Sequence, residues 1–260
     1  MNRSIERALA ALAAIALVAT PLAAMDISSA DVQYSRLLVR YTTPGGVRYA
    51  SWRSNGEDFK KLSQVVTSYR AASTKDLSGA EREAYYINSY NARVVEMILQ
   101  GNPPRSIKNL SRMLKPMEIF SRAVVVIDGK PTSLKTLAKK LIEETKDPRV
   151  YFALNCATRT SARLRDEAYD AVRLDTQLDD ATRSYLATQG TVDLTTAKGE
   201  TTITTVDIFK RYADDFKAAG GTLRFLADYG PAEAADAIKL RPGKVKLEFR
   251  KYDWSLNAAH

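Results

Sequence analysis

The sequence predicts an α+β fold: a single compact domain with a small mixed or antiparallel sheet flanked by several helices. Stretches of helical period alternate only irregularly with short β-branched runs, whereas a doubly wound sheet needs regular alternation. Near the end, Val245, Leu247 and Phe249 alternate strictly with charged residues. This alternation is typical of a half-exposed antiparallel strand.

The first 24 residues are predicted to be a signal peptide. Arg3 and Arg7 precede an alanine-rich apolar run, and small residues before Met25 would allow cleavage after Ala24. The apolar run is short for a membrane span, and an uncleaved N-terminal anchor is the alternative. We therefore expect a periplasmic protein whose mature part, residues 25–260, forms one domain.

Charge and cysteine content narrow the function classes. The formal net charge is +9, and it becomes +8 when the signal peptide removes two arginines and one glutamate. The basic residues are dispersed, so we expect at most weak attraction to anionic membrane or envelope surfaces and no nucleic-acid binding. A single cysteine excludes an internal disulfide. No zinc-ligand set, phosphate loop or dinucleotide fingerprint occurs, so no metal and no cofactor are predicted.

Helices are predicted from capping signals and apolar spacing. The clearest follows the capping box Ser78 to Glu81 and stops at Gly101. Residues 31–77 are expected to be helical with a short extended interruption at the turn after Thr43. The remaining helices are expected at 57–72 within that stretch, after the cap Thr132-Ser133, at 166–174, 176–188 and 207–218, and as two short helices near Gly220-Gly221 and Gly230-Pro231.

Strands are predicted from β-branched and apolar runs. Residues 122–127 form one strand, followed by the turn pair Asp128-Gly129, and 191–195 pairs with 201–205 in a hairpin. Val150 to Leu154, a continuous apolar run after Pro148, is expected to be a buried central strand. Asn155 and Cys156 would then stand at its carboxyl end, a common place for site residues.

Cys156 is the candidate nucleophile. A cysteine nucleophile needs its thiolate and therefore a base or a positive field. The only histidine is the terminal His260, so the candidates for such a field are the downstream arginines Arg159, Arg163 and Arg165. We favour a structural role for Cys156, with a catalytic one left open. A pair of Ser161 with Lys139 is a further, weak possibility.

Polar residues at two other places are candidates for a binding or structural site. Asn88 and Asn91 lie on the apolar stripe of the 79–100 helix, so we expect both to be buried and to clamp a backbone or line a cleft. The C-terminal segment 252–257 contains Trp254, which a frayed tail would not normally carry. We expect this segment to dock on the domain, with Asp253 and Asn257 supplying hydrogen bonds.

A series of motifs in a fixed order resembles the bacterial family called domain of unknown function 547. The motifs are 84–92 (AYYINSYNA), Ser106-Ile107, the strand, turn and Ser133-Leu134 segment, 147–156 (DPRVYFALNC) and 252–257 (YDWSLN). The resemblance covers about residues 33–257. It implies a single globular domain, often exported, with no settled activity and a fold distantly papain-like or transglutaminase-like at best.

If the family acts through cysteine and histidine, the departures from its pattern predict that this chain has lost the activity. The resemblance implies a histidine where this chain has Tyr151, another near Lys139, and a second cysteine with a proline at Ser161-Ala162; a tryptophan often stands at Tyr86. The retained residues are mostly amides, which bind well but are poor acids and bases. These retained residues are Asn88, Asn91, Asn155, Cys156, Asp253 and Asn257. The sequence thus predicts a non-catalytic protein that binds an unknown envelope ligand or protein, with a hydrolase or transferase using Cys156 as the alternative.

Overall fold

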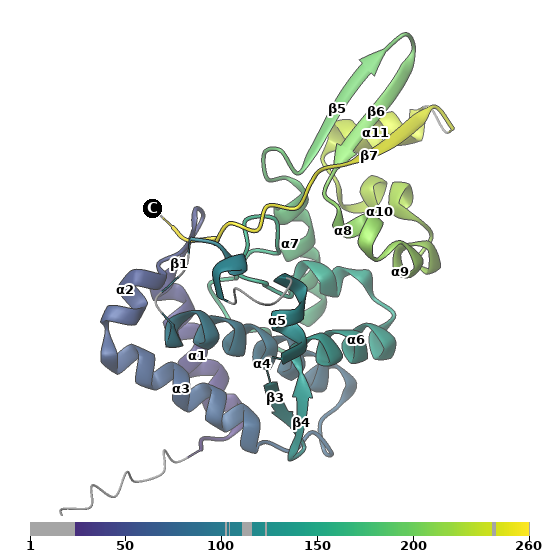
Figure 1. Ribbon diagram of the computed structural model, residues 1–260. Helices are drawn as coiled ribbons and strands as arrows, with labels where there is room; N and C mark the ends of the chain where they lie inside the picture. Colours follow the sequence, from purple (N-terminus) through teal and green to yellow (C-terminus); the bar gives the residue numbers. More distant parts are fainter. Residues whose placement is uncertain are drawn as a thin grey trace, which may run out of the picture.

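Helix α4 (Gly79–Gln100) is the central element of the larger part of the fold (Figure 1). The structure is a computed structural model that describes residues 24–101, 103, 105–110, 116–122, 124–240 and 243–259. The expected signal segment up to residue 23 and His260 lie outside these residues. Around α4 are arranged α1 (Ile27–Tyr41), α2 (Tyr49–Ser54), α3 (Gly56–Ala71), α5 (Pro116–Arg122), α6 (Leu134–Thr145) and the 3-10 helices η1 (Ile107–Leu110) and η2 (Pro148–Phe152).

The capping box predicted for α4 is confirmed. The Glu81 backbone N–H donates to Ser78 Oγ at 3.3 Å, and the Ser78 backbone N–H donates to the Glu81 carboxylate at 2.8 Å. These bonds satisfy two amides that would otherwise lack partners at the helix start. From Ala84 to Leu99 nearly every residue of α4 is buried, so this helix is part of the main apolar core over most of its length.

A second apolar cluster forms the smaller part of the fold. Its centre is a group of phenylalanines, Phe152, Phe209, Phe216 and Phe225, whose rings lie within 6.3 Å of one another. Its elements are α7 (Leu174–Leu186), α8 (Ile208–Arg211), α9 (Ala213–Ala218), α10 (Thr222–Tyr229), α11 (Ala232–Leu240), β5 (Val192–Ala197), β6 (Glu200–Thr205) and β7 (Val245–Phe249). Because η2 contributes Val150 to the first cluster and Phe152 to the second, the two clusters form a single compact α+β domain.

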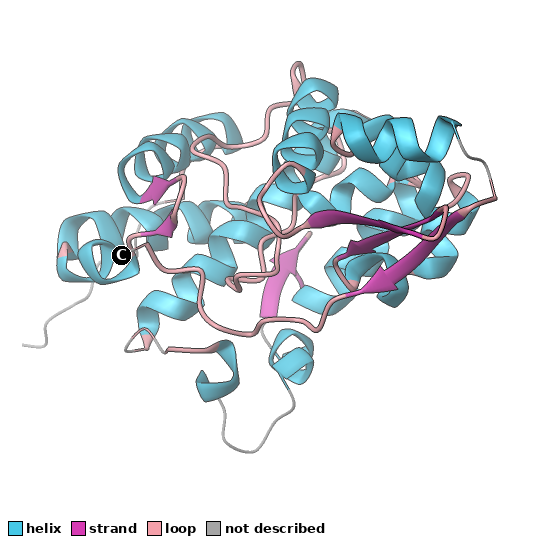
Figure 2. Cartoon of the chain, turned by 90° about the horizontal axis from the view of Figure 1, so that it is seen from above, coloured by secondary structure: helices cyan, strands magenta, loops and turns pink. Residues whose placement is uncertain are grey.

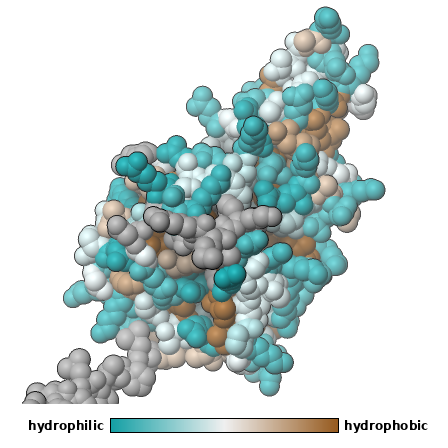
Figure 3. Space-filling view, viewed as in Figure 1, coloured by the Kyte–Doolittle hydropathy of each residue, from teal (hydrophilic) through white to brown (hydrophobic). Residues whose placement is uncertain are grey.

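The strands form three small sheets (Figure 2). Two are hairpins: β1 (Thr42–Thr43) with β2 (Gly46–Val47), and β3 (Val124–Ile127) with β4 (Lys130–Ser133). The third has the order β5-β6-β7, and its β5–β6 hairpin was predicted. Figure 3 shows a mostly hydrophilic surface in which apolar side chains gather beside this sheet.

The predicted antiparallel pairing of β7 is wrong. Strand β7 runs parallel to β6, with Ile203 opposite Leu247. The chain leaves β6, passes through α8 to α11 and returns in the original direction, and such a crossover connection makes neighbouring strands parallel. The alternating pattern identified a strand with two unlike faces, but it carried no information about the direction of its partner.

The predicted central strand at Val150 to Leu154 is also wrong, although its residues are buried as expected except for Tyr151, which is half-buried. Asp147 Oδ1 accepts the Arg149 N–H at 2.8 Å, and Pro148 is the first residue of the 3-10 helix η2. Proline at that position fixes a helical φ and needs no hydrogen-bond partner. A short apolar run fits a buried helical turn as well as a strand.

Two helix predictions need correction. Residues 166–173 form turns and irregular chain instead of the predicted helix 166–174, and the helix that follows begins earlier than expected, at Leu174. The predicted helix 207–218 is divided into α8 and α9 at Tyr212, which has φ −118° and ψ 36°. No helix of the described residues is long and apolar enough to cross a membrane.

Asn88 and Asn91 are buried clamps, as predicted. Asn91 Nδ2 donates to the Ala153 carbonyl at 2.9 Å, and Asn91 Oδ1 accepts the Asn155 N–H at 2.8 Å. Asn88 holds Tyr169 in the same way. Its Oδ1 accepts the Tyr169 N–H at 2.8 Å, and its Nδ2 donates to the Tyr169 carbonyl at 2.9 Å. Two irregular segments are thereby attached to α4 through paired backbone groups.

Replacement of Asn91 by alanine is expected to lower the free energy of unfolding by about 1–3 kcal/mol, because a buried carbonyl and N–H lose their partner. Urea unfolding measures the change. The matched control is Asn109→Ala, since Asn109 is exposed and the same truncation there should cost only a few tenths of a kcal/mol. Equal effects of the two substitutions would contradict the clamp.

The C-terminal segment docks on the domain, as predicted. Isolated bridges join Ser255 to Ser106, Leu256 to Thr158, and Ala258 to Val47. Asn257 accepts the Tyr49 hydroxyl on Oδ1 at 2.9 Å, and its carbonyl accepts the Val47 N–H at 2.8 Å. The segment therefore connects β2, η1 and the loop after Cys156.

A chain that ends at Arg250 is expected to melt several degrees lower than the full chain, a loss of about 1–2 kcal/mol. The reason is the loss of these backbone bonds together with the burial of Leu256. Thermal unfolding followed by circular dichroism measures it, with a chain ending at Ala259 as the control. A truncated chain with an unchanged melting curve would show that the segment contributes nothing to stability.

Candidate functional site

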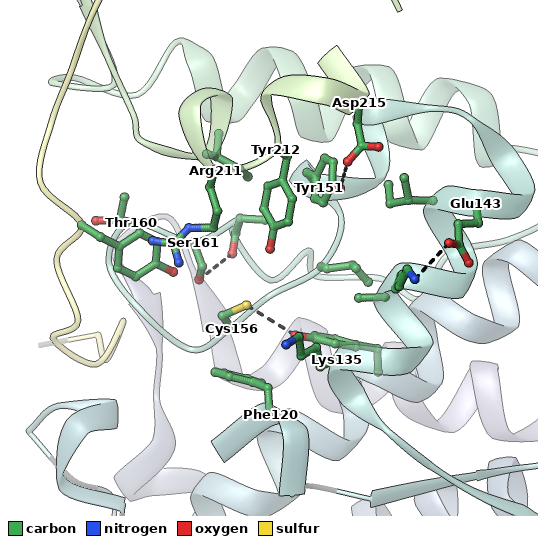
Figure 4. Close-up of a pocket in the computed structure, with 18 residues that line it drawn as sticks. Phe120, Lys135, Glu143, Tyr151, Cys156, Thr160, Ser161, Arg211, Tyr212 and Asp215 are labelled. Atoms are coloured by element: carbon green, nitrogen blue, oxygen red, sulfur yellow. Dashed lines mark hydrogen bonds and ion pairs between the residues drawn. The ribbon is translucent and has the colours of Figure 1, made fainter. Parts of the chain in front are cut away.

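A cavity of about 350 Å³ lies beside Cys156, between the two apolar clusters (Figure 4). Its walls come from α4, α5, α6, η2, the loop 154–162, α8, α9 and the C-terminal segment. Five aromatic rings line it: Tyr90, Phe120, Tyr151, Tyr212 and Tyr252. Its charged residues are Lys135, Lys139, Glu143, Arg211 and Asp215. The cavity is thus mainly apolar and aromatic, with a few charges at its edges.

Two asparagines hold the loop that carries Cys156. Asn91 fixes the backbone on the N-terminal side of the cysteine. Asn155 is fully buried, donates from Nδ2 to the Ala162 carbonyl at 2.5 Å and accepts the Ala157 N–H at 2.8 Å. Ala157 adopts φ 55°, a left-handed conformation that this bond stabilises locally. The two amides therefore position the thiol and do not themselves line the cavity.

The surroundings of Cys156 favour the neutral form of its thiol. Burial raises its pKa above the ordinary value, while a hydrogen bond with Tyr90 and the field of Arg211 act in the opposite direction. The Tyr90 hydroxyl lies 3.4 Å from Sγ. Part of the residue's surface opens into the cavity, but protein atoms enclose the sulfur closely enough for burial to prevail. The direction expected from the sequence is confirmed.

The positive charge that faces Cys156 comes from Arg211, which sequence reasoning missed. Arg211 follows Cys156 by many residues, on α8, and no spacing rule links the two. It donates to Asp207 at 2.7 Å, and its guanidinium lies 5.3 Å from the centre of the Tyr252 ring. Figure 4 shows Cys156 between Phe120 on one side and Arg211 and Tyr212 on the other.

The three arginines proposed from the sequence do not line this cavity. Arg165 instead donates to Glu167 at 2.6 Å. Arg159 and Arg163 line a separate cleft on the other side of the loop. The suggestion that these arginines converge on the thiol is therefore wrong.

Ser161 and Lys139 both line the cavity but are not paired with each other. The Ser161 hydroxyl donates to the Thr158 carbonyl at 2.9 Å and accepts the Thr158 N–H at 3.2 Å. Lys139 forms an ion pair with Glu143 at 3.3 Å. The serine hydroxyl is thus committed to its own loop, and the lysine does not act on it.

Four of the five positions where the resemblance implies a different residue line the cavity, whereas the fifth, Tyr86, lies elsewhere and accepts a hydrogen bond from Lys140 at 2.8 Å. Tyr151, Lys139, Ser161 and Ala162 line it together with Cys156. Tyr151 donates to Asp215 at 2.5 Å and stacks on Tyr212 with ring centres 3.9 Å apart. Burial raises the pKa of Tyr151, so its hydroxyl stays protonated at neutral pH. These positions are distant in sequence, so only the structure shows that they share one wall.

The remaining predicted site residues lie elsewhere. Asn88 and Asn91 are structural clamps, and Asn155 shapes the loop. Asp253 accepts the Ser255 N–H at 2.9 Å and Asn257 binds Tyr49, both at the C-terminal segment. Within the described ranges no group of three or more histidine, cysteine, aspartate or glutamate side chains could hold a metal ion.

Iodoacetamide is expected to alkylate Cys156 slowly in the folded protein at pH 7, because only a few per cent or less of a thiol with a pKa at or above about 8.5 is ionised there. The rate should rise steadily as the pH is raised from 7, because the ionised fraction of a thiol increases until the pH exceeds its pKa, and it should increase on unfolding in urea. Mass spectrometry of timed samples measures it, and the urea-unfolded chain is the control. Fast alkylation with an apparent pKa well below 7 would contradict the neutral thiol.

Comparisons with known proteins place part of the chain in a family. No curated protein and no solved structure matches the sequence. The model of the family described as "Protein of unknown function, DUF547" matches residues 74–186. This match includes α4 with both asparagine clamps, the loop with Cys156 and the whole of α7. Residues 74–186 of this chain therefore belong to that family of proteins of unknown function.

Proposed function

We propose that the protein is a non-catalytic binding protein of the cell envelope and that the cavity beside Cys156 holds its ligand. The observation that carries this proposal is the combination of an enclosed aromatic cavity with a neutral thiol. Small-molecule sites are usually concave, mostly apolar, and provided with a few polar groups that orient the ligand. The cavity has this composition, and its volume of about 350 Å³ suits a small ligand.

The polar groups around Cys156 support the same proposal, because cysteine catalysis needs a group that removes the thiol proton. The polar partner of Cys156 is the Tyr90 hydroxyl, and burial raises the pKa of Tyr90 as well. A protonated phenol cannot remove the thiol proton, so the pair lacks a general base. Ser161 is bonded within its loop and Lys139 is bonded to Glu143. The groups around the thiol can orient a ligand but are poorly suited to activate a nucleophile.

The ligand that fits best is a compact molecule with an aromatic or aliphatic body. Aromatic rings cover most of the wall and gain from burial of apolar area and from stacking. Lys135, on the first turn of α6, and Arg211 could each contact a polar or anionic group at the edge of the cavity. The specificity of the site would therefore reside in shape first and in one polar contact second.

An enzyme that uses Cys156 is the second candidate. It is favoured by Arg211, whose charge lowers the pKa of the thiol, and by the opening of the cysteine into a cavity. In that case a bound substrate would have to stabilise the Cys156 thiolate enough to offset the effect of burial on the pKa of the thiol. The alkylation measurement described above decides between the two candidates, because catalysis needs a thiolate at neutral pH.

The envelope location in this proposal rests on the basic start, the apolar run and the small residues up to Ala24. The lone cysteine is compatible with an oxidising compartment, since no second thiol is present to pair with it. We propose export and cleavage after Ala24, with an uncleaved anchor as the alternative. Recovery of a chain that begins at Met25 from a periplasmic extract would support cleavage.

Ala138→Phe is expected to block the cavity, because residue 138 lines it from α6 and the added ring takes up space. Binding of the neutral dye N-phenyl-1-naphthylamine, followed by its fluorescence, should weaken at least tenfold. The control Ala80→Phe adds the same ring at an exposed site on α4 and should leave binding unchanged. Cys156→Ser should also bind nearly normally. Equal binding by the blocked variant, with a normal melting curve, would contradict a ligand site here.

A further inference from the structure

Two clefts lined by basic residues flank the C-terminal segment, and the first shares Thr160 and Ser161 with the wall of the Cys156 cavity. Their volumes are about 500 and 740 Å³. They share Arg159, Asp253 and Ala258, so they are neighbours along the segment, and we call them together the tail clefts. The first reaches the β1–β2 turn and the end of α7, and the second reaches α2, Pro103 and Arg105.

Positive charge concentrates in the tail clefts. Six basic residues line them: Arg48, Arg105, Arg159, Arg163, Arg250 and Lys251. Asp253 is the one carboxylate among their described lining residues, and hydrogen bonds from Ser255 hold its pKa below the usual range. Arg250 pairs with Asp193 nearby. All six basic side chains are exposed to solvent.

The uncharged lining of the tail clefts is rich in hydroxyl and amide groups. Thr43, Thr160, Thr188 and Gln189 line the first cleft. Two tyrosines also contribute, but both are buried and their hydroxyls are bonded: Tyr49 to Asn257 and Tyr185 to the Thr160 carbonyl. The clefts therefore offer hydrogen bonds and positive charge without an exposed aromatic ring.

We propose that the tail clefts bind a linear acidic polysaccharide. Two adjoining clefts with basic residues along both suit an extended ligand with repeated negative charges better than a single small anion. Hydroxyl and amide groups match the hydroxyls of sugars, and arginine forks match their carboxylates. This proposal does not depend on a ligand in the cavity beside Cys156. It assigns a role to six of the basic residues that give the chain its positive net charge.

The form of the tail clefts disfavours two other polyanions. Single-stranded nucleic acid binds through bases that stack on exposed aromatic rings, which the described lining residues do not provide. An anionic membrane would meet the rims of two concave clefts and would leave the residues inside them uncontacted. The C-terminal backbone also makes the clefts rigid, because Val47, Ala157 and Arg159 bond to Asn257 and Ser255. A preformed groove reduces the entropy lost when a chain-like ligand binds.

The test replaces four exposed lining residues with glutamine: Arg48, Arg105, Arg163 and Lys251. Binding of fluorescein-labelled polygalacturonate oligomers, followed by anisotropy at low salt, should weaken at least tenfold. Binding by the unchanged protein should fall as salt is added, because salt screens these exposed charges. The control replaces Lys60, Lys130, Lys217 and Lys239 with glutamine; it removes the same charge outside the clefts and should change binding less than threefold.

Four outcomes would overturn the proposal. The two quadruple variants could lose binding equally, which would mean general charge attraction. The full chain could bind neutral dextran as well as polygalacturonate. It could prefer a single-stranded DNA oligomer, or phosphatidylglycerol vesicles, when equal charge is offered. Melting curves confirm that each variant folds, and Ala138→Phe should retain polygalacturonate binding, so a failure of this site differs from a failure of the proposed ligand cavity.

Discussion

The bidentate hydrogen bonding of Asn91 is the constraint on which the rest of the site depends. The Asn91 side chain on α4 bonds to the Ala153 carbonyl and to the Asn155 N–H. These backbone groups are buried in an irregular segment, where no neighbouring strand could supply their hydrogen-bond partners. Asn155 then continues the chain of bonds to Ala157 and Ala162. In a buried setting such linked bonds are costly to break singly. The position of Cys156 is therefore set by amides from two segments.

The cavity exists because two apolar clusters meet along one short helix. Within η2, Val150 packs into the helical cluster and Phe152 into the phenylalanine cluster, while Tyr151 between them is half-buried at the junction. A 3-10 helix allows three successive side chains to point in three directions, which a strand with two faces would not. The position where the resemblance implies a histidine is thus the one directed between the clusters.

The sequence predicted those structural features that are determined by residues close to one another in the chain. The capping box of α4, the turn pair Asp128-Gly129 and the burial of Asn88 were all deducible, because each follows from spacing within one element. The 3-10 helix at Val150 to Leu154 was not, since a short apolar run fits two conformations and Pro148 with Asp147 decided between them. Arg211 was missed for another reason: its place beside Cys156 depends on how α8 packs, and packing between distant segments has no local signal.

The close approach of Gly46 to the C-terminal segment has a consequence for the order of folding. A methyl group at Gly46 would lie 2.2 Å from the Asn257 carbonyl oxygen, and φ at Gly46 is 129°, a conformation that glycine adopts readily. A contact between segments this far apart in sequence requires closure of a very long loop. The Val47 N–H can donate to the Asn257 carbonyl only after every residue between them has been synthesised. The helices of both apolar clusters are therefore made before the contact that closes the domain can form.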